Sequence, residues 1–525
     1  MWSTPSTSRS ILISCLAASC LAIIALIPAR GQNHASAVVH YQQGMALYRA
    51  HDPEGAIREL SRATEIDPHY AAAWNDLGVI QRQRGNVKTA IDSFRHAVRK
   101  KPQFAGAEYN LALALEAVHD VAGAVEHAQR VIAVAPKMPQ GHALLGRLLT
   151  EQNHLEAARD EFRRGLDLDP SLASARTGLG AVLYKLGFVS DALRELRQAA
   201  QQDPNSAQAH FQLGLALFAG GAQQEAKSEF ERAVALAPDL AEARINLGQL
   251  LENEAKTPEA VTQYRRALAV SPPDADVELK LARALVKMQS LDEARRTLDS
   301  AVRQHPRNAG LHFERGKLLV AAGDRDGALR ELKTATELNP KAAEFYLELS
   351  RALHDLGKHD EQKAALETAV RLDPNSVEAR YALANLARQT GDRATSREQF
   401  AKVQQLRQVE VNRDLAQGEI RAGVVLAGKR DFDAAIEHFR KAIAIDPKLG
   451  EAHFDLAGAL LEKGDARAAI PSFRQAIALA PAWAEAHYQL GRALLQAGAR
   501  DEAMGEFRTA LKNDPEHVGA RQALR

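Results

Sequence analysis

Small and apolar residues return along this chain in a fixed order every 34 residues. The stretch 71–104 shows one unit, and its marker residues are Trp74, Leu77, Gly78, Gly85, Ala90, Phe94, Ala97 and Pro102. The small residues Gly78 and Ala90 fit a close crossing of two helices, and Gly85 permits a tight turn between them. Proline ends the second helix, because it lacks a donor and clashes with the preceding turn. Each unit is therefore predicted to be a helix-turn-helix pair, helix A followed by helix B.

Proline fixes the boundaries of the units. It stands at 68, 102, 136, 170, 204, 238, 272, 306, 340 and 374, and again at 447, 481 and 515. When this proline is position 32 of the unit, the pattern predicts units one to eleven over 37–410 and units twelve to fourteen over 416–517. Residues 518–525 then form a short C-terminal cap. Such an array offers one long surface instead of a single deep pocket.

The unit resembles the tetratricopeptide repeat, whose pattern is W-x2-L-G-x2-Y, then A-x3-F, then P. In the unit 71–104 Trp74, Leu77 and Gly78 match the first part, whereas Gln81 replaces the tyrosine. The resemblance implies an all-α fold, namely a right-handed α-solenoid (a superhelix) of about fourteen helix-turn-helix units. It also implies that ligand contacts come from positions 2, 5, 9, 12 and 13 of helix A.

The 34-residue period is interrupted once. Gln408 stands where proline is expected, and the next unit begins after the five residues 411–415. Between Thr395 and Leu426 the sequence has no proline, and apolar residues recur at roughly helical spacing. We expect one extended helix there, or a helix with a short break. The insertion is either simply tolerated or serves as a hinge.

The first 31 residues are of a different kind. Ile11–Ile27 is uncharged and mostly apolar, follows Arg9, and precedes small residues suited to cleavage before Gln32. This order is typical of a secretory signal peptide. The segment is either removed, which makes the protein exported, periplasmic or secreted, or retained as a signal anchor through residues 11–27.

Composition and motifs argue against several functions. The 67 basic and 66 acidic side chains balance to a net charge of +1, which gives no footprint for nucleic acid. Both cysteines, Cys15 and Cys20, lie in the first segment, so a chain beginning at Gln32 has no thiol chemistry. Gly310 and Gly316 are separated by five residues, where a phosphate loop needs four. We expect no catalytic residue, no metal and no cofactor.

Histidine often replaces tryptophan at position 4 of helix A. We interpret these side chains as packing substitutes and not as metal ligands, since stacked units hold them about a helix diameter apart. They are His40, His142, His210, His312, His453 and His487.

The contact positions of the family select a candidate binding surface. Position 9 carries bases in three consecutive units, and Arg388 follows at position 12 of the next. Position 5 is often aromatic, and Tyr184 is at position 12. The candidate residues are Arg283, Lys317, Arg351, Arg388, Phe313, Tyr381, Phe211 and Tyr184. We predict that the inner surface of units eight to eleven binds an extended acidic segment. The alternatives are that the aromatic rings are half-buried between helices and that the bases pair with position-2 acids of neighbouring units.

Three functions are compatible with these features of the chain. The favoured one is a non-catalytic protein–protein interaction scaffold of the cell envelope. The second is a peptide chaperone or adaptor subunit of a secretion or polysaccharide-export machine. The third and most remote is an accessory subunit of an enzyme such as a glycosyltransferase. In each case the partners are proteins or peptides and not nucleic acid, and the membrane is contacted only through an uncleaved N-terminal segment.

Overall fold

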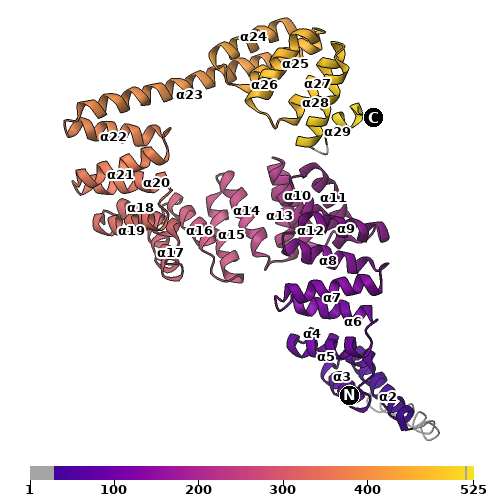
Figure 1. Ribbon diagram of the computed structural model, residues 1–525. Coiled ribbons are helices and arrows are strands. Elements are labelled where there is room, and N and C mark those ends of the chain that lie inside the picture. Colours follow the sequence, from indigo (N-terminus) through magenta and orange to yellow (C-terminus); the bar gives the residue numbers. More distant parts are fainter. Residues whose placement is uncertain (1–28, 515–516, 525) are drawn as a thin grey trace, which may run out of the picture. The chain divides into compact units, whose positions relative to one another are not determined.

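A computed structural model of the chain describes residues 29–514 and 517–524. These residues form helices, with no strand among them, and they divide into two compact units at Ser271 and Pro272. The all-α solenoid predicted from the sequence is confirmed (Figure 1). The apolar segment 11–27 lies outside the described residues.

The first compact unit contains α2 to α15. Their bounds are α2 (Ala29–Arg49), α3 (Pro53–Ile66), α4 (Ala71–Gln83), α5 (Val87–Lys100), α6 (Ala105–Glu116), α7 (Val121–Val134), α8 (Pro139–Glu151), α9 (Leu155–Leu168), α10 (Ala173–Lys185), α11 (Val189–Gln202), α12 (Ala207–Ala219), α13 (Gln223–Leu236), α14 (Ala241–Asn253) and α15 (Thr257–Val270).

The second compact unit contains α16 to α29. Their bounds are α16 (Ala275–Lys287), α17 (Leu291–Gln304), α18 (Ala309–Ala321), α19 (Arg325–Leu338), α20 (Ala343–Asp355), α21 (His359–Leu372), α22 (Val377–Gln389), α23 (Arg393–Gly428), α24 (Phe432–Ile445), α25 (Gly450–Lys463), α26 (Ala466–Leu479), α27 (Ala484–Gln496), α28 (Arg500–Asn513) and α29 (Val518–Ala523).

The turn between helix A and helix B has one conformation throughout. Position 15 has a positive φ both where it is glycine, as in Gly85 (81°), and where it is not, as in His51 (62°) and Ala255 (59°). A side chain in this left-handed region costs roughly 1–2 kcal/mol, which glycine avoids. The packing of the two helices therefore sets the conformation of the turn. Glycine lowers the conformational free energy that this turn costs.

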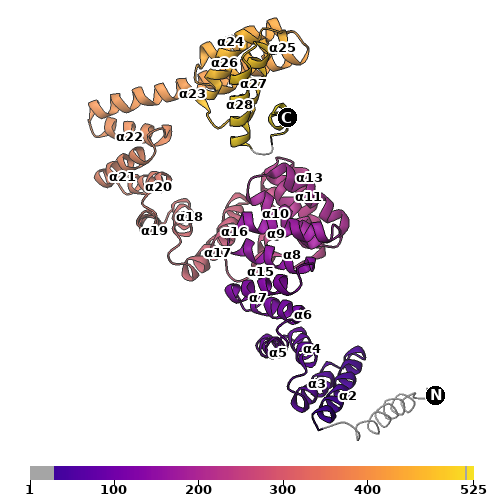
Figure 2. The same ribbon diagram turned by 45° about the vertical axis from the view of Figure 1, so that its right-hand side comes forward.

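A small residue at position 8 and an apolar residue at position 24, often an aromatic ring, fit together inside the helix pairs. A Cβ atom added to Gly78 would lie 2.7 Å from the ring of Phe94, and one added to Gly491 would lie 2.5 Å from Phe507. Both rings are fully buried. Within each compact unit, helix B also packs against helix A of the following pair, so that α4 to α7 lie side by side in a row (Figure 1, Figure 2).

One helix, α23, is far longer than the others, with 36 residues. Its first part packs against α22 and buries Val403, and its last part packs against α24 and buries Ala416 and Ile420. Between them, residues 404–415 are exposed except for the partly buried Leu406 and Asn412. No proline or glycine interrupts this middle stretch, and the helix is continuous through it.

Candidate protein-interaction surface

In several repeats the side chain at position 4 of helix A forms hydrogen bonds to helix B of its own repeat and to the proline carbonyl of the preceding repeat. In His142 the Nδ1 atom lies 2.7 Å from Oε2 of Glu161 on α9, and Nε2 lies 3.1 Å from the carbonyl oxygen of Pro136. The same pair of contacts recurs at three other histidines, His210, His312 and His487. A carboxylate and a carbonyl oxygen both accept hydrogen bonds, so an imidazole that donates from both ring nitrogens satisfies the two contacts at once.

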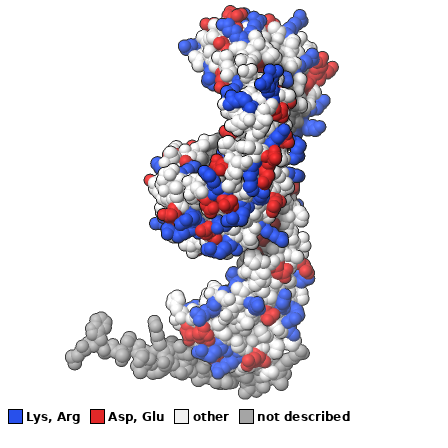
Figure 3. Space-filling model, turned by 90° about the vertical axis from the view of Figure 1, so that its left-hand side faces the viewer, with Lys and Arg blue, Asp and Glu red and all other residues white. Residues whose placement is uncertain are grey.

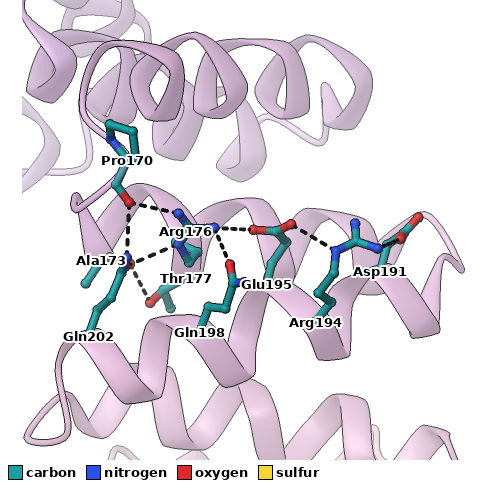
Figure 4. Close-up of polar contacts among 9 residues, drawn as sticks. All are labelled: Pro170, Ala173, Arg176, Thr177, Asp191, Arg194, Glu195, Gln198 and Gln202. Atoms are coloured by element: carbon teal, nitrogen blue, oxygen red, sulfur yellow. Dashed lines mark hydrogen bonds and ion pairs between the residues drawn. The ribbon is translucent and has the colours of Figure 1, made fainter.

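Arginine makes the same connection in other units. The Nη1 atom of Arg176 donates to Glu195 at 2.7 Å and its Nη2 atom donates to the carbonyl oxygen of Pro170 at 2.8 Å (Figure 4). Gln202 donates to the same carbonyl oxygen at 3.0 Å. The indole of Trp74 reaches the carbonyl oxygen of Pro68 at 3.2 Å.

The sequence interpretation of these histidines as packing substitutes was therefore incomplete. What Trp74, His142 and Arg176 share is an N–H that donates to the proline carbonyl of the preceding repeat. The signal that sequence reasoning missed is the acid or amide at position 23, which accompanies histidine and arginine at position 4 in every repeat except that of His453. These contacts join each of these A helices to the preceding repeat, and the A helices line the surfaces described next.

Three of the four predicted bases are paired with carboxylates of the same protein. Glu314 accepts from Nε of Arg283 at 2.7 Å and from Nζ of Lys317 at 3.1 Å. Arg351 pairs with Glu348 at 2.6 Å and lies 3.7 Å from Glu378. The acceptors are mainly glutamates at position 6, and only Glu378 is one of the position-2 acids considered from the sequence. Arg388 is exposed.

The predicted aromatic residues are divided between core and surface. Phe313 is 5 % exposed and stacks on Phe345 with ring centroids 4.4 Å apart, and Phe211 is 8 % exposed. Tyr184 is half-buried. Tyr381 is 47 % exposed and meets Phe400 edge-on at 5.8 Å. Of the four, Tyr381 is thus the most exposed, and the guanidinium of Arg407 lies over its ring at 5.9 Å from the centroid.

A groove of about 430 Å³ lies along the A helices of the first compact unit. We call it the polar groove; its neutral polar lining comes from Gln140 and Thr150 of α8, Ser174 and Thr177 of α10, and Gln208 and Gln212 of α12. Arg147 and Glu151 of α8 and Lys185 of α10 are its charged residues. Tyr109 of α6 and Phe162 of α9 add rings. Phe162 reaches the groove because Gly178 has no side chain: a Cβ atom there would lie 2.3 Å from its Cζ atom.

Neither the distribution of charge nor a metal-binding cluster indicates a further candidate binding surface among the residues that the structure describes. On the face shown in Figure 3, acidic and basic side chains are interspersed. Within residues 29–514 and 517–524, no cluster of three or more histidine, cysteine or acidic side chains could hold a metal ion. Among the helices that the structure describes, none has the length and apolar character needed to cross a membrane.

Several solved structures are similar to this chain. A tetratricopeptide repeat protein from Parabacteroides merdae is 16% identical over 48% of this chain and 99% of its own, with a TM-score of 0.41. The Cut9–Hcn1 hetero-tetramer matches 97% of this chain and 98% of its own at 16% identity and a TM-score of 0.35. YrrB matches 36% of this chain and 96% of its own at 20% identity and a TM-score of 0.32. No curated protein matches the sequence.

Family profiles match most of the chain. Two profiles described as tetratricopeptide repeat match residues 41–103, 177–241 and 224–276, and residues 254–312, 319–386, 426–470 and 460–525. A third, described as TPR repeat, matches 146–187. These matches agree with the helix pairs, the turn at position 15 and the small residue at position 8. The chain belongs to the tetratricopeptide repeat family, whose members are generally non-catalytic scaffolds for protein–protein interaction.

Proposed function

We propose that this protein is a non-catalytic scaffold of the cell envelope that binds an extended segment of a partner protein in the polar groove. The observation that carries the proposal is the lining of that groove, in which three successive A helices each contribute neutral polar side chains. An array of this kind presents the same type of contact at regular intervals along one direction.

The neutral polar part of the lining suits the main chain of an extended segment, and the charged side chains of Arg147, Glu151 and Lys185 also line the groove. Glutamine amides both donate and accept hydrogen bonds, which matches the alternating N–H and C=O groups of an extended backbone. Gln140, Gln208 and Gln212 supply such amides, and the ring of Phe162 supplies an apolar floor for a side chain of the ligand. The basic row of the second unit is less suited to an acidic segment, because its charges are already paired.

The envelope assignment rests on the N-terminal sequence. Ile11–Ile27 and the small residues before Gln32 have the order of a signal peptide. Export places the repeats outside the cytoplasm, and retention of the segment places them at a membrane surface.

Site-specific photocrosslinking tests the binding site. A photoreactive residue is placed at Gln212 in the polar groove or, as a matched control, at the exposed Gln201 on α11. Crosslinked partner segments, identified by mass spectrometry, are expected from Gln212 and not from Gln201. With the photoreactive residue kept at position 212, the substitution of Gln140→Ala together with Gln208→Ala is expected to reduce the yield. Equal yields from positions 212 and 201, or an unchanged yield in the double variant, would show that the groove is not the binding site.

A further inference from the structure

Carboxylates at position 6 of helix A have cationic partners in the repeats of α18 and α20. Glu314 on α18 is paired with Lys317 at position 9 of its own helix and with Arg283 at position 9 of the preceding repeat. Glu348 on α20 is paired with Arg351, again at position 9. A base at position 9 thus neutralises the acid at position 6, three residues earlier in the chain.

Asp455 on α25 has the same position but lacks these partners. Gly458 replaces the base at position 9 of its own repeat, and Val424 replaces the base at position 9 of the preceding one. From the residues that the structure describes, no hydrogen bond or ion pair reaches its carboxylate. Asp76, the other aspartate at position 6, accepts a hydrogen bond from the hydroxyl of Tyr41 at 2.8 Å.

The missing side chains leave a groove of about 510 Å³ between the last part of α23 and α25. We call it the aspartate groove; its residues include Val424, Ala427, Phe454, Asp455 and Gly458. A Cβ atom added to Gly458 would have nothing within 4 Å, and Val424 is 50 % exposed. There is room here for a side chain that the protein itself does not supply.

The carboxylate lies in an environment that disfavours its own charge. Burial raises the pKa of Asp455 to about 6, and the negative charge of the nearby Glu451 contributes to the rise. Such a group gains more from a cation than a fully solvated carboxylate does, because less water competes for it.

The repeat of α18 shows how a cation is held in this geometry. Nζ of Lys317 lies 5.2 Å from the ring centroid of Phe313, at position 5, while it pairs with Glu314 at position 6. Positions 5 and 6 of α25 are Phe454 and Asp455. The ring and the carboxylate are both present there, and only the lysine is absent.

We propose that the aspartate groove binds a lysine or arginine side chain of an extended partner segment, with its cation on Asp455 and its aliphatic stem against Val424 and Phe454. The partner chemistry follows from charge complementarity with a carboxylate set in an apolar groove. The proposal concerns the second compact unit and does not depend on the polar groove of the first.

A positional peptide library tests this proposal on the full chain. The probes are acetylated and amidated octapeptides in which the fourth residue is lysine, arginine, norleucine, glutamine or glutamate and the others are mixtures. Wild-type protein is expected to enrich lysine and arginine over norleucine about fivefold, the scale of one partly exposed ion pair. Norleucine has nearly the stem of lysine without its charge, so this ratio isolates the cation. Absence of enrichment would overturn the proposal.

Three variants assign the enrichment to its residues. Asp455→Asn removes the charge, and Gly458→Lys supplies from within the chain the base that Lys317 provides on α18; both are expected to abolish the enrichment. Gly458→Lys replaces a helix glycine that meets no neighbour, so folding is preserved. Glu437→Gln, at an exposed position of α24 outside the aspartate groove, is the control and should leave the enrichment intact. Enrichment that survives Asp455→Asn would also overturn the proposal.

Arg430 also lines the aspartate groove, so its guanidinium is a cation of the protein itself that could compete for Asp455. Arg430→Ala is expected to leave the ratio of lysine to norleucine unchanged. Enrichment that appears only in this variant would mean that Arg430 fills the site in the wild-type protein, which would contradict the proposal. Failure here leaves the crosslinking result at Gln212 untouched, so the two binding sites are judged separately.

Discussion

Nδ1 of His142 on α8 lies 2.7 Å from Oε2 of Glu161 on α9, and both side chains are buried. In another repeat the two residue types exchange positions: Nδ1 of His127 on helix B lies 2.5 Å from Oε2 of Glu108 on helix A. The structure therefore keeps a hydrogen-bonded pair between positions 4 and 23, whichever helix carries the histidine. Only the histidine at position 4 also reaches the proline carbonyl, and it thereby links two repeats.

His142→Ala is expected to lower the free energy of unfolding by about 1–3 kcal/mol, because it leaves the buried Glu161 without this donor. His453→Ala is the control: its Nε2 atom contacts the Pro447 carbonyl at 3.0 Å, but position 23 of its repeat is Ser472. His453→Ala should lower the free energy of unfolding by less than His142→Ala does. Urea unfolding followed by circular dichroism measures both. The exchanged double variant His142→Glu with Glu161→His should recover most of the loss; a double variant as unstable as His142→Ala would contradict the pairing.

The pair of His312 and Glu331 makes stability depend on pH. The hydrogen bond to Glu331 raises the pKa of His312. Burial alone would raise the pKa of Glu331, but the hydrogen bond from His312 and the charge of Arg315 lower it on balance. The histidine contribution is complete below about 6.5 and is lost as pH rises through its raised pKa. The glutamate contribution is complete above about 4.5 and is lost as pH falls through its lowered pKa.

The stabilisation by this pair is therefore expected to be largest between about pH 4.5 and 6.5. The difference in urea midpoint between wild type and His312→Gln, measured from pH 4 to 9, should peak in that window. Glutamine keeps a donor but cannot be charged, so it serves as the matched substitution. A difference that stays constant across this range would contradict the ionic character of the pair.

The period of 34 residues predicted the helix pairs, because proline, the turn residue and the small residues at positions 8 and 20 act within one repeat. Contacts between repeats were harder to predict. Arg283 pairs with Glu314 on the next A helix, and this contact becomes apparent only when adjacent A helices are side by side. Glu314 and Glu348 also lie three residues before Lys317 and Arg351, a spacing within one helix that the sequence itself contains. The pairing of positions 4 and 23 spans a turn and 19 residues, which the period of a single helix does not reveal.

Two glycines of the grooves should respond in opposite ways to alanine. In Gly178→Ala the new Cβ atom would lie 2.3 Å from Cζ of Phe162, and the strain should cost about 1–3 kcal/mol. In Gly458→Ala the Cβ atom meets nothing within 4 Å, and the higher helix propensity of alanine should add about 1 kcal/mol. Thermal unfolding of the two variants compares them. Equal shifts in the same direction would show that Phe162 can move aside freely.

The N-terminal segment can be tested directly. If it is a cleaved signal peptide, the exported protein should begin at or near Gln32, as determined by N-terminal sequencing or intact mass. A retained anchor would instead leave Met1–Gly31 on the protein, which would stay in the membrane pellet after alkaline extraction. A full-length product in the soluble cytoplasmic fraction would contradict the envelope assignment altogether.

The middle of α23 is expected to be the first site of proteolytic cleavage. Helices are stabilised mainly by packing, and an unpacked helical stretch of this length is marginal in water. Val409 and Val411 are each 50 % exposed and Leu415 is 56 % exposed, whereas the two ends of α23 are packed on their neighbours. Trypsin should therefore cut after Arg407 or Arg413, within the interval of about 388–430 that also contains the slip in register. The products should be one fragment of about eleven repeats and one of about three.

Glycine substitutions separate exposure from local instability as the cause of this cleavage. Gln408→Gly with Val411→Gly lowers helix propensity by roughly 1 kcal/mol per site and should speed the cut severalfold. Arg421→Gly makes the same type of change at an exposed position in the packed part of α23, and it should have little effect on the rate. The time course is followed by gel electrophoresis and mass spectrometry. First cuts within α4 to α15, or equal acceleration by both variants, would show that the weakest part of the solenoid lies elsewhere, because local opening at 404–415 would then not control access of the protease.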